Sequence, residues 1–224
     1  MAIKIQGNGG TTADVDGTNF RALRSVNRPT DHGTAGAYTY GGFTGILPAA
    51  LASNSEIFQF RWNEAARLCV INEIKLSACV TTTFFAAGVP VQIDLCKVTG
   101  WSAAGSGGTR PTIAALMKKR TSMPSSLVNA NDIGIATTAA LTVGTKTIEA
   151  TSLATIVAPG PITASLNGQI VAPGTTFWQS EVGDGQHPLV LANQEGFVIR
   201  SVAVPATGTW QVAITVDWTE VDAY

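Results

Sequence analysis

Two histidines are the residues best suited to acid–base chemistry in this chain of 224 residues. His187 follows Asp184 by three positions, and the two could join a serine in a hydrolase triad. No G-x-S-x-G sequence marks a nucleophile, however, and residues 182–188 have the composition of a turn between two strands. The other histidine, His32, stands beside Asp31 in a segment rich in glycine. We therefore predict that the protein has no catalytic residues and is not an enzyme.

Closely spaced oxygen ligands of the kind that calcium prefers occur once, from Asp14 to Asn19. The EF-hand pattern fails there, because its twelfth position is Ser25 rather than a bidentate glutamate. A hairpin turn accounts for the segment more simply. No phosphate-binding loop, dinucleotide fingerprint or zinc ligand set occurs elsewhere. We expect neither a bound metal nor a cofactor.

Two of the five tryptophans are candidates for contact with a ligand such as a sugar, on which aromatic rings can stack. Trp101 lies among Gly and Ser in a predicted loop, and Trp178 lies in a polar strand. The other three, Trp62, Trp210 and Trp218, fall on the apolar faces of predicted strands and are expected in the core.

Strands must position all of these residues, since no segment has a convincing helical pattern. The closing segment alternates apolar and polar residues from Trp210 to Trp218, and similar alternation occurs at 58–62, 74–80 and 91–95. Breaks rich in Gly, Pro and Ser separate the strands, at 99–111, 122–131 and 158–174. Short strands joined by such loops predict an all-β fold, an antiparallel β-sandwich of the jelly-roll type.

Residues 1–45 differ from residues 46–224, because they are rich in glycine and hold few large apolar side chains. Such a segment buries too little surface to fold alone. We expect an extended N-terminal arm that ties subunits together, followed by the sandwich domain. The predicted assembly contacts of the arm are apolar side chains and arginines that would bridge to a neighbour: Ile3, Ile5, Phe20, Arg21, Leu23, Arg24, Val26 and Arg28.

Only 13% of the residues are charged, against about 25% in a typical soluble domain, and the net charge is −1. A lightly charged surface suits a protein whose faces are covered by neighbours. Basic residues are scattered apart from 118–120, so no nucleic-acid surface is predicted. No apolar run has the length of a signal peptide or a membrane helix, which predicts synthesis in a cytoplasm and no membrane partner. The cysteines, at 69, 79 and 96, are expected to be buried reduced thiols.

Several stretches resemble a group of tailed-bacteriophage virion structural proteins, capsid-associated and decoration-like. They are Thr12–Arg24, Asn54–Trp62, Lys118–Ser122, His187–Leu191 and Val216–Glu220. Together they span nearly the whole chain. The resemblance implies a location in the virion after synthesis in the host cytoplasm, and it carries over no catalytic or ligand residue.

The function expected from these observations is that of a decoration or cement protein that stabilises a phage shell through contacts between subunits. Its partners would be other virion proteins, major capsid or tail proteins, and itself as a homo-oligomer. A tail, baseplate or fibre-anchoring component is an alternative within the same particle. A receptor- or glycan-binding module that uses Trp101 and Trp178 is the alternative from a different class.

Overall fold

A computed structural model describes residues 35–86, 89–112, 117–160, 168–180 and 187–222. The chain divides into two units, Met1–Asp31 and His32–Tyr224, and the described residues all belong to the second. Their regular structure consists of strands alone, so the prediction of an all-β protein is confirmed. Within these ranges no helix has the length and apolarity that a membrane crossing requires.

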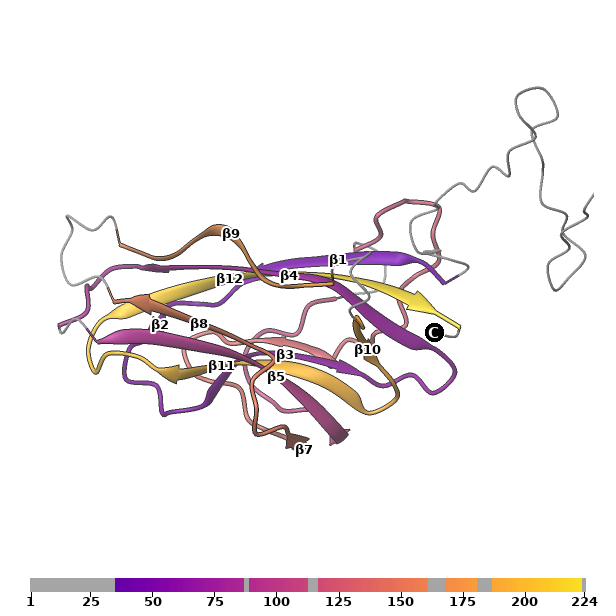
Figure 1. Cartoon of the computed structure of the whole chain (residues 1–224), viewed down its shortest axis with the longest axis horizontal. Helices are drawn as coiled ribbons and strands as arrows, with labels where there is room; N and C mark the ends of the chain where they lie inside the picture. The colour runs from indigo at the N-terminus through magenta and orange to yellow at the C-terminus, as the bar shows by residue number, and fades with distance from the viewer. Residues whose placement is uncertain (1–34, 87–88, 113–116, 161–167, 181–186, 223–224) are drawn as a thin grey trace, which may run out of the picture. The chain divides into compact units, whose positions relative to one another are not determined.

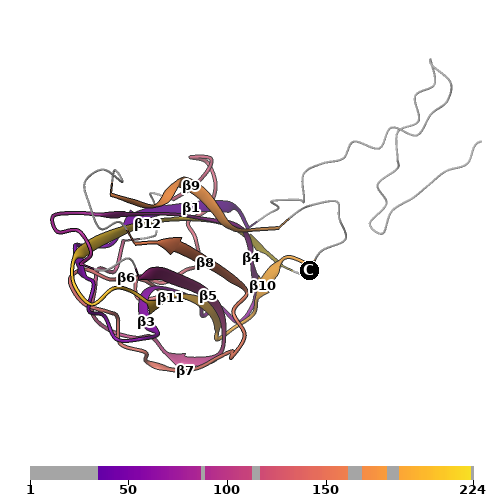
Figure 2. The ribbon, with the colours of Figure 1, turned by 60° about the vertical axis from the view of Figure 1, so that its left-hand side comes forward.

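Twelve strands form two antiparallel sheets in the described part of the chain (Figure 1). Sheet I has the order β1 (Ala37–Phe43), β12 (Thr209–Val221), β4 (Leu68–Val80) and β10 (Leu189–Leu191), with β2 (Leu47–Pro48) paired to β12 and β9 (Gln169–Gln179) paired to β4. Sheet II has the order β6 (Ile133–Ile135), β3 (Ser55–Trp62), β11 (Glu195–Ala203), β5 (Pro90–Ala103) and β7 (Thr145–Ile148), with β8 (Ala154–Pro159) paired to β5. The two sheets form two layers with the core between them (Figure 2).

Apolar residues on alternate positions of the strands fill that core. In β12 the side chains from Trp210 to Trp218 that were predicted to face inward are all fully or almost fully buried. Trp218 meets Phe60 of sheet II edge to face, with ring centroids 5.3 Å apart, and Tyr38 stacks on Trp218 at 5.7 Å. Aromatic contacts across the layers therefore hold the two sheets together.

Strand β3 interrupts its own alternation with a bulge. Along β11, Ile199 pairs with Phe58 while the next residue, Arg200, pairs with Glu56, so Ile57 is the extra residue. Both Ile57 and Phe58 lie in the core. A bulge reverses the phase of the strand on one side of it, and Glu56 consequently lies on the outer face of sheet II, within hydrogen-bonding distance of Gln59.

Strand β1 shows that the sandwich begins earlier than residue 46. It pairs with β12 from Ala37 to Phe43, inside the segment that was assigned to the arm. Tyr38 and Tyr40 are buried and alternate with small residues, and the neighbouring glycines concealed this pattern in the composition. The predicted arm contacts are outside the described residues: Ile3, Ile5, Phe20, Arg21, Leu23, Arg24, Val26 and Arg28.

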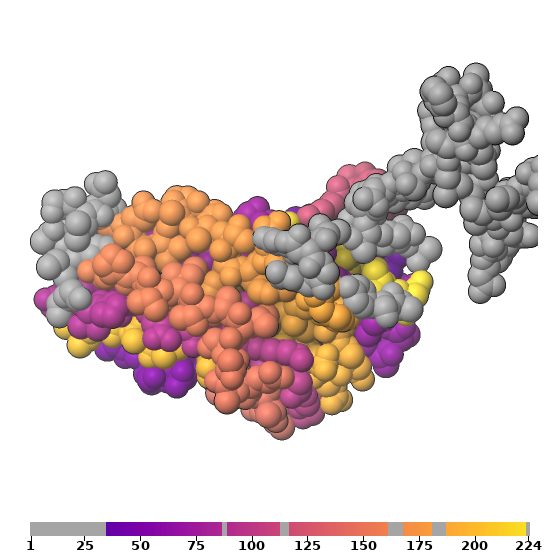
Figure 3. Space-filling view, viewed as in Figure 1, coloured from indigo at the N-terminus to yellow at the C-terminus, as the bar shows by residue number. Residues whose placement is uncertain are grey.

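Strands β8 and β9 lie next to each other at one edge of the two layers, where the space-filling view shows them side by side (Figure 3). Strand β9 belongs to sheet I and β8 to sheet II. They close this edge of the sandwich, so the apolar side chains between the sheets are covered there.

Candidate functional site

His187, the histidine considered above for a hydrolase triad, is exposed. The Nδ1 atom of His187 lies 2.7 Å from the carbonyl oxygen of Pro188. Asp184, His32 and the segment 14–19 lie outside the described residues. Within the described ranges, no three His, Cys, Asp or Glu side chains are grouped so that they could hold a metal ion.

The two tryptophans named as candidate ligand contacts lie on different sheets. Trp101 belongs to β5 rather than to a loop, and only 1% of it is exposed. Its indole N–H donates to the carbonyl of Ala103 at 3.1 Å, and Lys146 Nζ lies 4.2 Å from the ring centroid. Trp178 of β9 is half-buried against the core opposite Ile74. The loop predicted for Trp101 was therefore wrong, because β5 continues farther than the glycine and serine content indicated.

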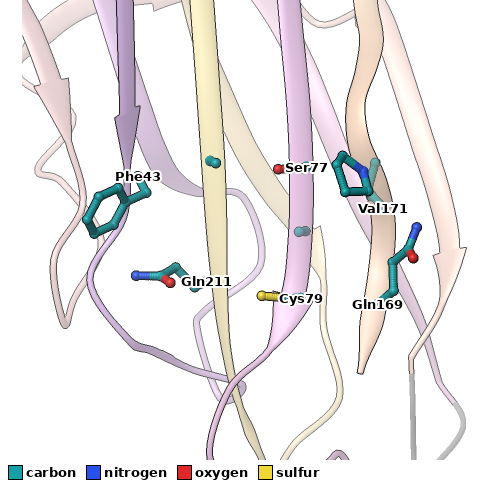
Figure 4. A pocket seen from close by; sticks show the side chains of 9 residues that line it. Phe43, Ser77, Cys79, Gln169, Val171 and Gln211 are labelled. Carbon is teal, nitrogen blue, oxygen red and sulfur yellow. The ribbon is translucent and has the colours of Figure 1, made fainter. Parts of the chain in front are cut away.

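A hollow lies on the outer face of sheet I, and we call it the sheet I groove (Figure 4). Its volume is about 260 Å³. Its lining comes from β1, β12, β4 and β9: Phe43, Gln211, Ala213, Ser77, Ala78, Cys79, Gln169, Val171 and Pro173. None of these side chains carries a formal charge at neutral pH.

Strand alternation produces this groove. Inward residues such as Tyr40 and Val80 enter the core, so Phe43 and Cys79 point outward, and Phe43 is 69% exposed. Small outward residues such as Ala213 leave the hollow between them. Gln211 borders it and donates from Nε2 to the carbonyl of Thr44 at 2.6 Å.

The prediction that the three cysteines are buried is wrong for Cys79. Cys69 and Cys96 are buried as expected, whereas Cys79 is exposed in the groove. The physical reason is its position in β4 between two inward residues, Ala78 and Val80. An apolar run in a sequence does not by itself distinguish the two faces of a strand.

Charges elsewhere on the outer face of sheet I are matched in pairs. Lys75 lies 2.7 Å from Glu73, and Lys119 lies 3.0 Å from Asp217. The basic run at 118–120 is thus partly neutralised by β12. The face combines an uncharged groove with a balanced charged region, which disfavours it as a site for a polyanion.

Sheet II has a different outer face, which the connecting segments 104–112 and 136–144 cover in the described part of the chain. A small apolar cluster lies beneath them, formed by Cys96, Val98, Trp101 and Val198 with Ile148 packed against it. Close approach of the covering chain requires glycine at residue 105, where a Cβ atom would lie 1.9 Å from the carbonyl oxygen of Thr142. This covering layer also buries polar side chains of β3.

The first polar group beneath the layer is an ion pair between strand β3 and the turn before β6. Arg61 Nε donates to Asp132 Oδ1 at 2.6 Å, and both side chains are largely or wholly buried. The second oxygen of Asp132 accepts the backbone N–H of Asn129 at 3.1 Å. The pair therefore attaches the turn before β6 to β3.

The second polar group, which we call the β3 cluster, consists of Glu56, Gln59, Lys146 and Arg110. Glu56 Oε2 accepts hydrogen bonds from Lys146 Nζ and from Gln59 Nε2, each at 2.6 Å. Arg110 Nη2 donates to Gln59 Oε1 at 3.4 Å. The side chains of Glu56 and Lys146 are 1% and 0% exposed. Sequence reasoning missed this cluster, although polar residues at 56, 59 and 61 within an apolar strand were a visible signal.

Sheet I also contains a buried carboxylate, that of Glu220 near the end of β12. It accepts hydrogen bonds from the Ser126 hydroxyl at 2.6 Å, the Leu127 backbone N–H at 3.1 Å and the Trp218 indole N–H at 3.3 Å. Burial raises the pKa of Glu220, and these hydrogen bonds oppose that rise. Burial, followed by the charge of Glu220, also raises the pKa of Tyr38 to about 12. Tyr38 donates from its hydroxyl to the carbonyl of Pro124 at 3.1 Å, so Tyr38 and Glu220 together hold the 124–128 segment on sheet I.

The fold and the sites together define an all-β protein of two packed antiparallel sheets, with one outer face hollowed and the other covered by loops. Comparison with protein-family models, with curated proteins and with solved structures found no match to the chain.

Proposed function

We propose that the chain is a non-enzymatic virion structural protein, a decoration or cement protein that packs the sheet I groove against a neighbouring subunit. The observation that carries the proposal is the groove itself. It is uncharged, it is bordered by an exposed Phe43, and it lies on a face whose lysines are paired with carboxylates. An exposed apolar hollow of this kind costs solvation in an isolated monomer and suits the centre of a subunit interface.

The order of the long strands supports a jelly-roll assignment. Sheet I contains β1, β12, β4 and β9, and sheet II contains β3, β11, β5 and β8, each in that spatial order. Apart from β5 and β8, which pair within sheet II, successive long strands thus pass between the layers as two intertwined Greek keys would. Viral capsid domains are among the proteins built this way. Because a fold alone does not determine function, this observation adds only to the case made by the groove.

The groove indicates the chemistry of its occupant. An apolar side chain of the neighbour would lie between Phe43 and Pro173, and Gln169 would offer hydrogen bonds to its backbone at the rim. A virion setting supplies repeated copies of such a neighbour, either this protein or a capsid protein. The resemblance of the sequence to phage virion proteins supports that setting.

Light scattering of the purified full chain over a range of concentrations tests the assembly role. We expect the wild-type protein to self-associate and Phe43→Asp to be a folded monomer, because a carboxylate in the groove would lose its hydration in the interface. Val157→Asp is the matched control, since Val157 is similarly exposed, at 62%, but lies on β8. A wild-type monomer at every concentration, or equal behaviour of the two variants, would contradict the proposed interface.

The virion location has its own test. Mass spectrometry of purified particles of the virus that carries this sequence should find the protein in many copies per particle. Its absence from the particles would refute the virion assignment without affecting the self-association result.

A further inference from the structure

The β3 cluster brings a primary amine, a carboxylate and a carboxamide into contact in a site closed to solvent. Lys146 Nζ and Gln59 Nε2 both donate to the same oxygen, Glu56 Oε2. The other oxygen, Glu56 Oε1, is buried and has no hydrogen-bond partner. A structural ion pair would satisfy both oxygens of a buried carboxylate, so the cluster calls for another explanation.

Each member of the cluster meets a requirement of acyl transfer from a carboxamide to an amine. The nucleophile must be a neutral amine, and burial lowers the pKa of Lys146 although Glu56 opposes that shift. The carboxylate is placed to move protons between the two nitrogens. The Arg110 guanidinium donates to Gln59 Oε1, where negative charge would develop.

We propose that Lys146 and Gln59 become joined by an intramolecular amide bond, with Glu56 as the proton carrier. Lys146 first gives a proton to Glu56. Its Nζ then attacks Cδ of Gln59, and the bond from Cδ to Nε2 breaks as Glu56 passes a proton to Nε2. The attacking nitrogen loses its second proton to Glu56, and that proton leaves with ammonia as ammonium. No oxidant, metal or other reactant is needed.

The surroundings favour this reaction over hydrolysis. The Trp101 ring lies 4.2 Å from Lys146 Nζ and the covering segments exclude water, which would otherwise compete for the acyl carbon. The departing nitrogen, Gln59 Nε2, also donates to the carbonyl of Thr142 at 2.8 Å, so its position is held on two sides. Orientation of this kind makes a slow bimolecular reaction effectively unimolecular.

The bond would connect strands that are not neighbours in sheet II. β7 pairs with β5, and β11 separates β5 from β3. An amide from β7 to β3 would therefore fasten the covering layer across the sheet. This is a property of the single subunit, and it stands apart from the proposed groove interface.

Intact mass spectrometry of the denatured full-length protein tests the proposal. We expect a mass about 17 Da below that of the unmodified chain, since one ammonia is lost, and a digest should contain a branched peptide that joins Lys146 to Gln59. Lys146→Arg, which keeps the positive charge, and Glu56→Met should each abolish the branched peptide. Lys75→Arg is the control, because Lys75 is paired with Glu73 at the surface, and it should retain it.

Each other result overturns the proposal. A wild-type chain of unmodified mass excludes the bond whether or not the variants fold. A loss of about 18 Da, the mass of water, with Lys146 joined to Glu56 would show condensation with the carboxylate instead. A branched peptide that persists in Glu56→Met would show that the carboxylate has no part in the reaction.

Discussion

Replacement of Asp132 by asparagine should be among the most destabilising single substitutions outside the core. The change removes the negative charge opposite the buried Arg61 and replaces one of the two acceptor oxygens by an amide donor, so that, among the described residues, the cation keeps only neutral partners such as the carbonyls of Trp101 and Ser102, at 3.5 and 3.3 Å. Removing one member of a buried ion pair costs about 3–5 kcal/mol in free energy of unfolding. Since typical domains have about 5–15 kcal/mol in total, the loss would be a large share of the stability.

Urea denaturation followed by tryptophan fluorescence measures this loss. Thermal unfolding should show a melting temperature lower by about 6 to 20 °C, since about 1 kcal/mol corresponds to about 2–4 °C for a domain of this size. Asp222→Asn is the control, because Asp222 is paired with Arg67 at 2.9 Å and is 62% exposed, and its loss should cost less than about 1 kcal/mol.

A second substitution separates the buried charge from other effects. Adding Arg61→Met to Asp132→Asn removes the unpaired cation, while the asparagine can still accept the backbone N–H of Asn129. The double variant should therefore be more stable than Asp132→Asn alone. A cost below about 1 kcal/mol for Asp132→Asn, or a double variant that is less stable than Asp132→Asn, would contradict the stabilising role of the ion pair.

Two further predictions concern the groove and the buried carboxylate. A thiol reagent should modify Cys79 and spare Cys69 and Cys96 in the folded protein, and modification of Cys79 should slow as self-association covers the groove; equal reactivity of the three thiols would contradict the burial described. Burial raises the pKa of Glu220 above 4.5, so the native state retains a proton that the unfolded chain releases when the pH exceeds 4.5. The contribution of Glu220 to the free energy of unfolding therefore falls as the pH rises from 4.5 through the raised pKa of the native state. Glu220→Gln removes this fall, so urea titrations at pH 4.5 and 7 should show the wild type losing stability relative to the variant, and a constant difference between the two would disprove the linkage.

Local alternation predicted much of the fold. The inward residues of β12 and of β4 were identified from the period of two, because side chains on a strand alternate between faces whatever the strand pairs with. The prediction failed where composition concealed the pattern. Strand β1 was assigned to the arm because Gly41 and Gly42 lie beside its buried tyrosines, and Trp101 was placed in a loop because Gly and Ser surround it.

The candidate sites were less accessible to such reasoning. The groove needs Phe43, Cys79 and Gln169 from three strands on one face, and their order in the sheet is set by pairings between distant segments. The sequence marks each of these residues as part of a strand but contains no local signal of which strands will be neighbours.

Residue type and spacing were sufficient to predict strands rather than helices, an apolar core and a lightly charged surface, because these properties depend on residues within a few positions of one another. The contacts between buried polar residues, in contrast, depend on how distant strands pair. A bulge at Ile57 turns Glu56 outward, and chain folding brings Lys146 to it from 90 residues away. The physical reason is that the free energy of such contacts depends on burial and on partners from remote strands, which no local pattern records.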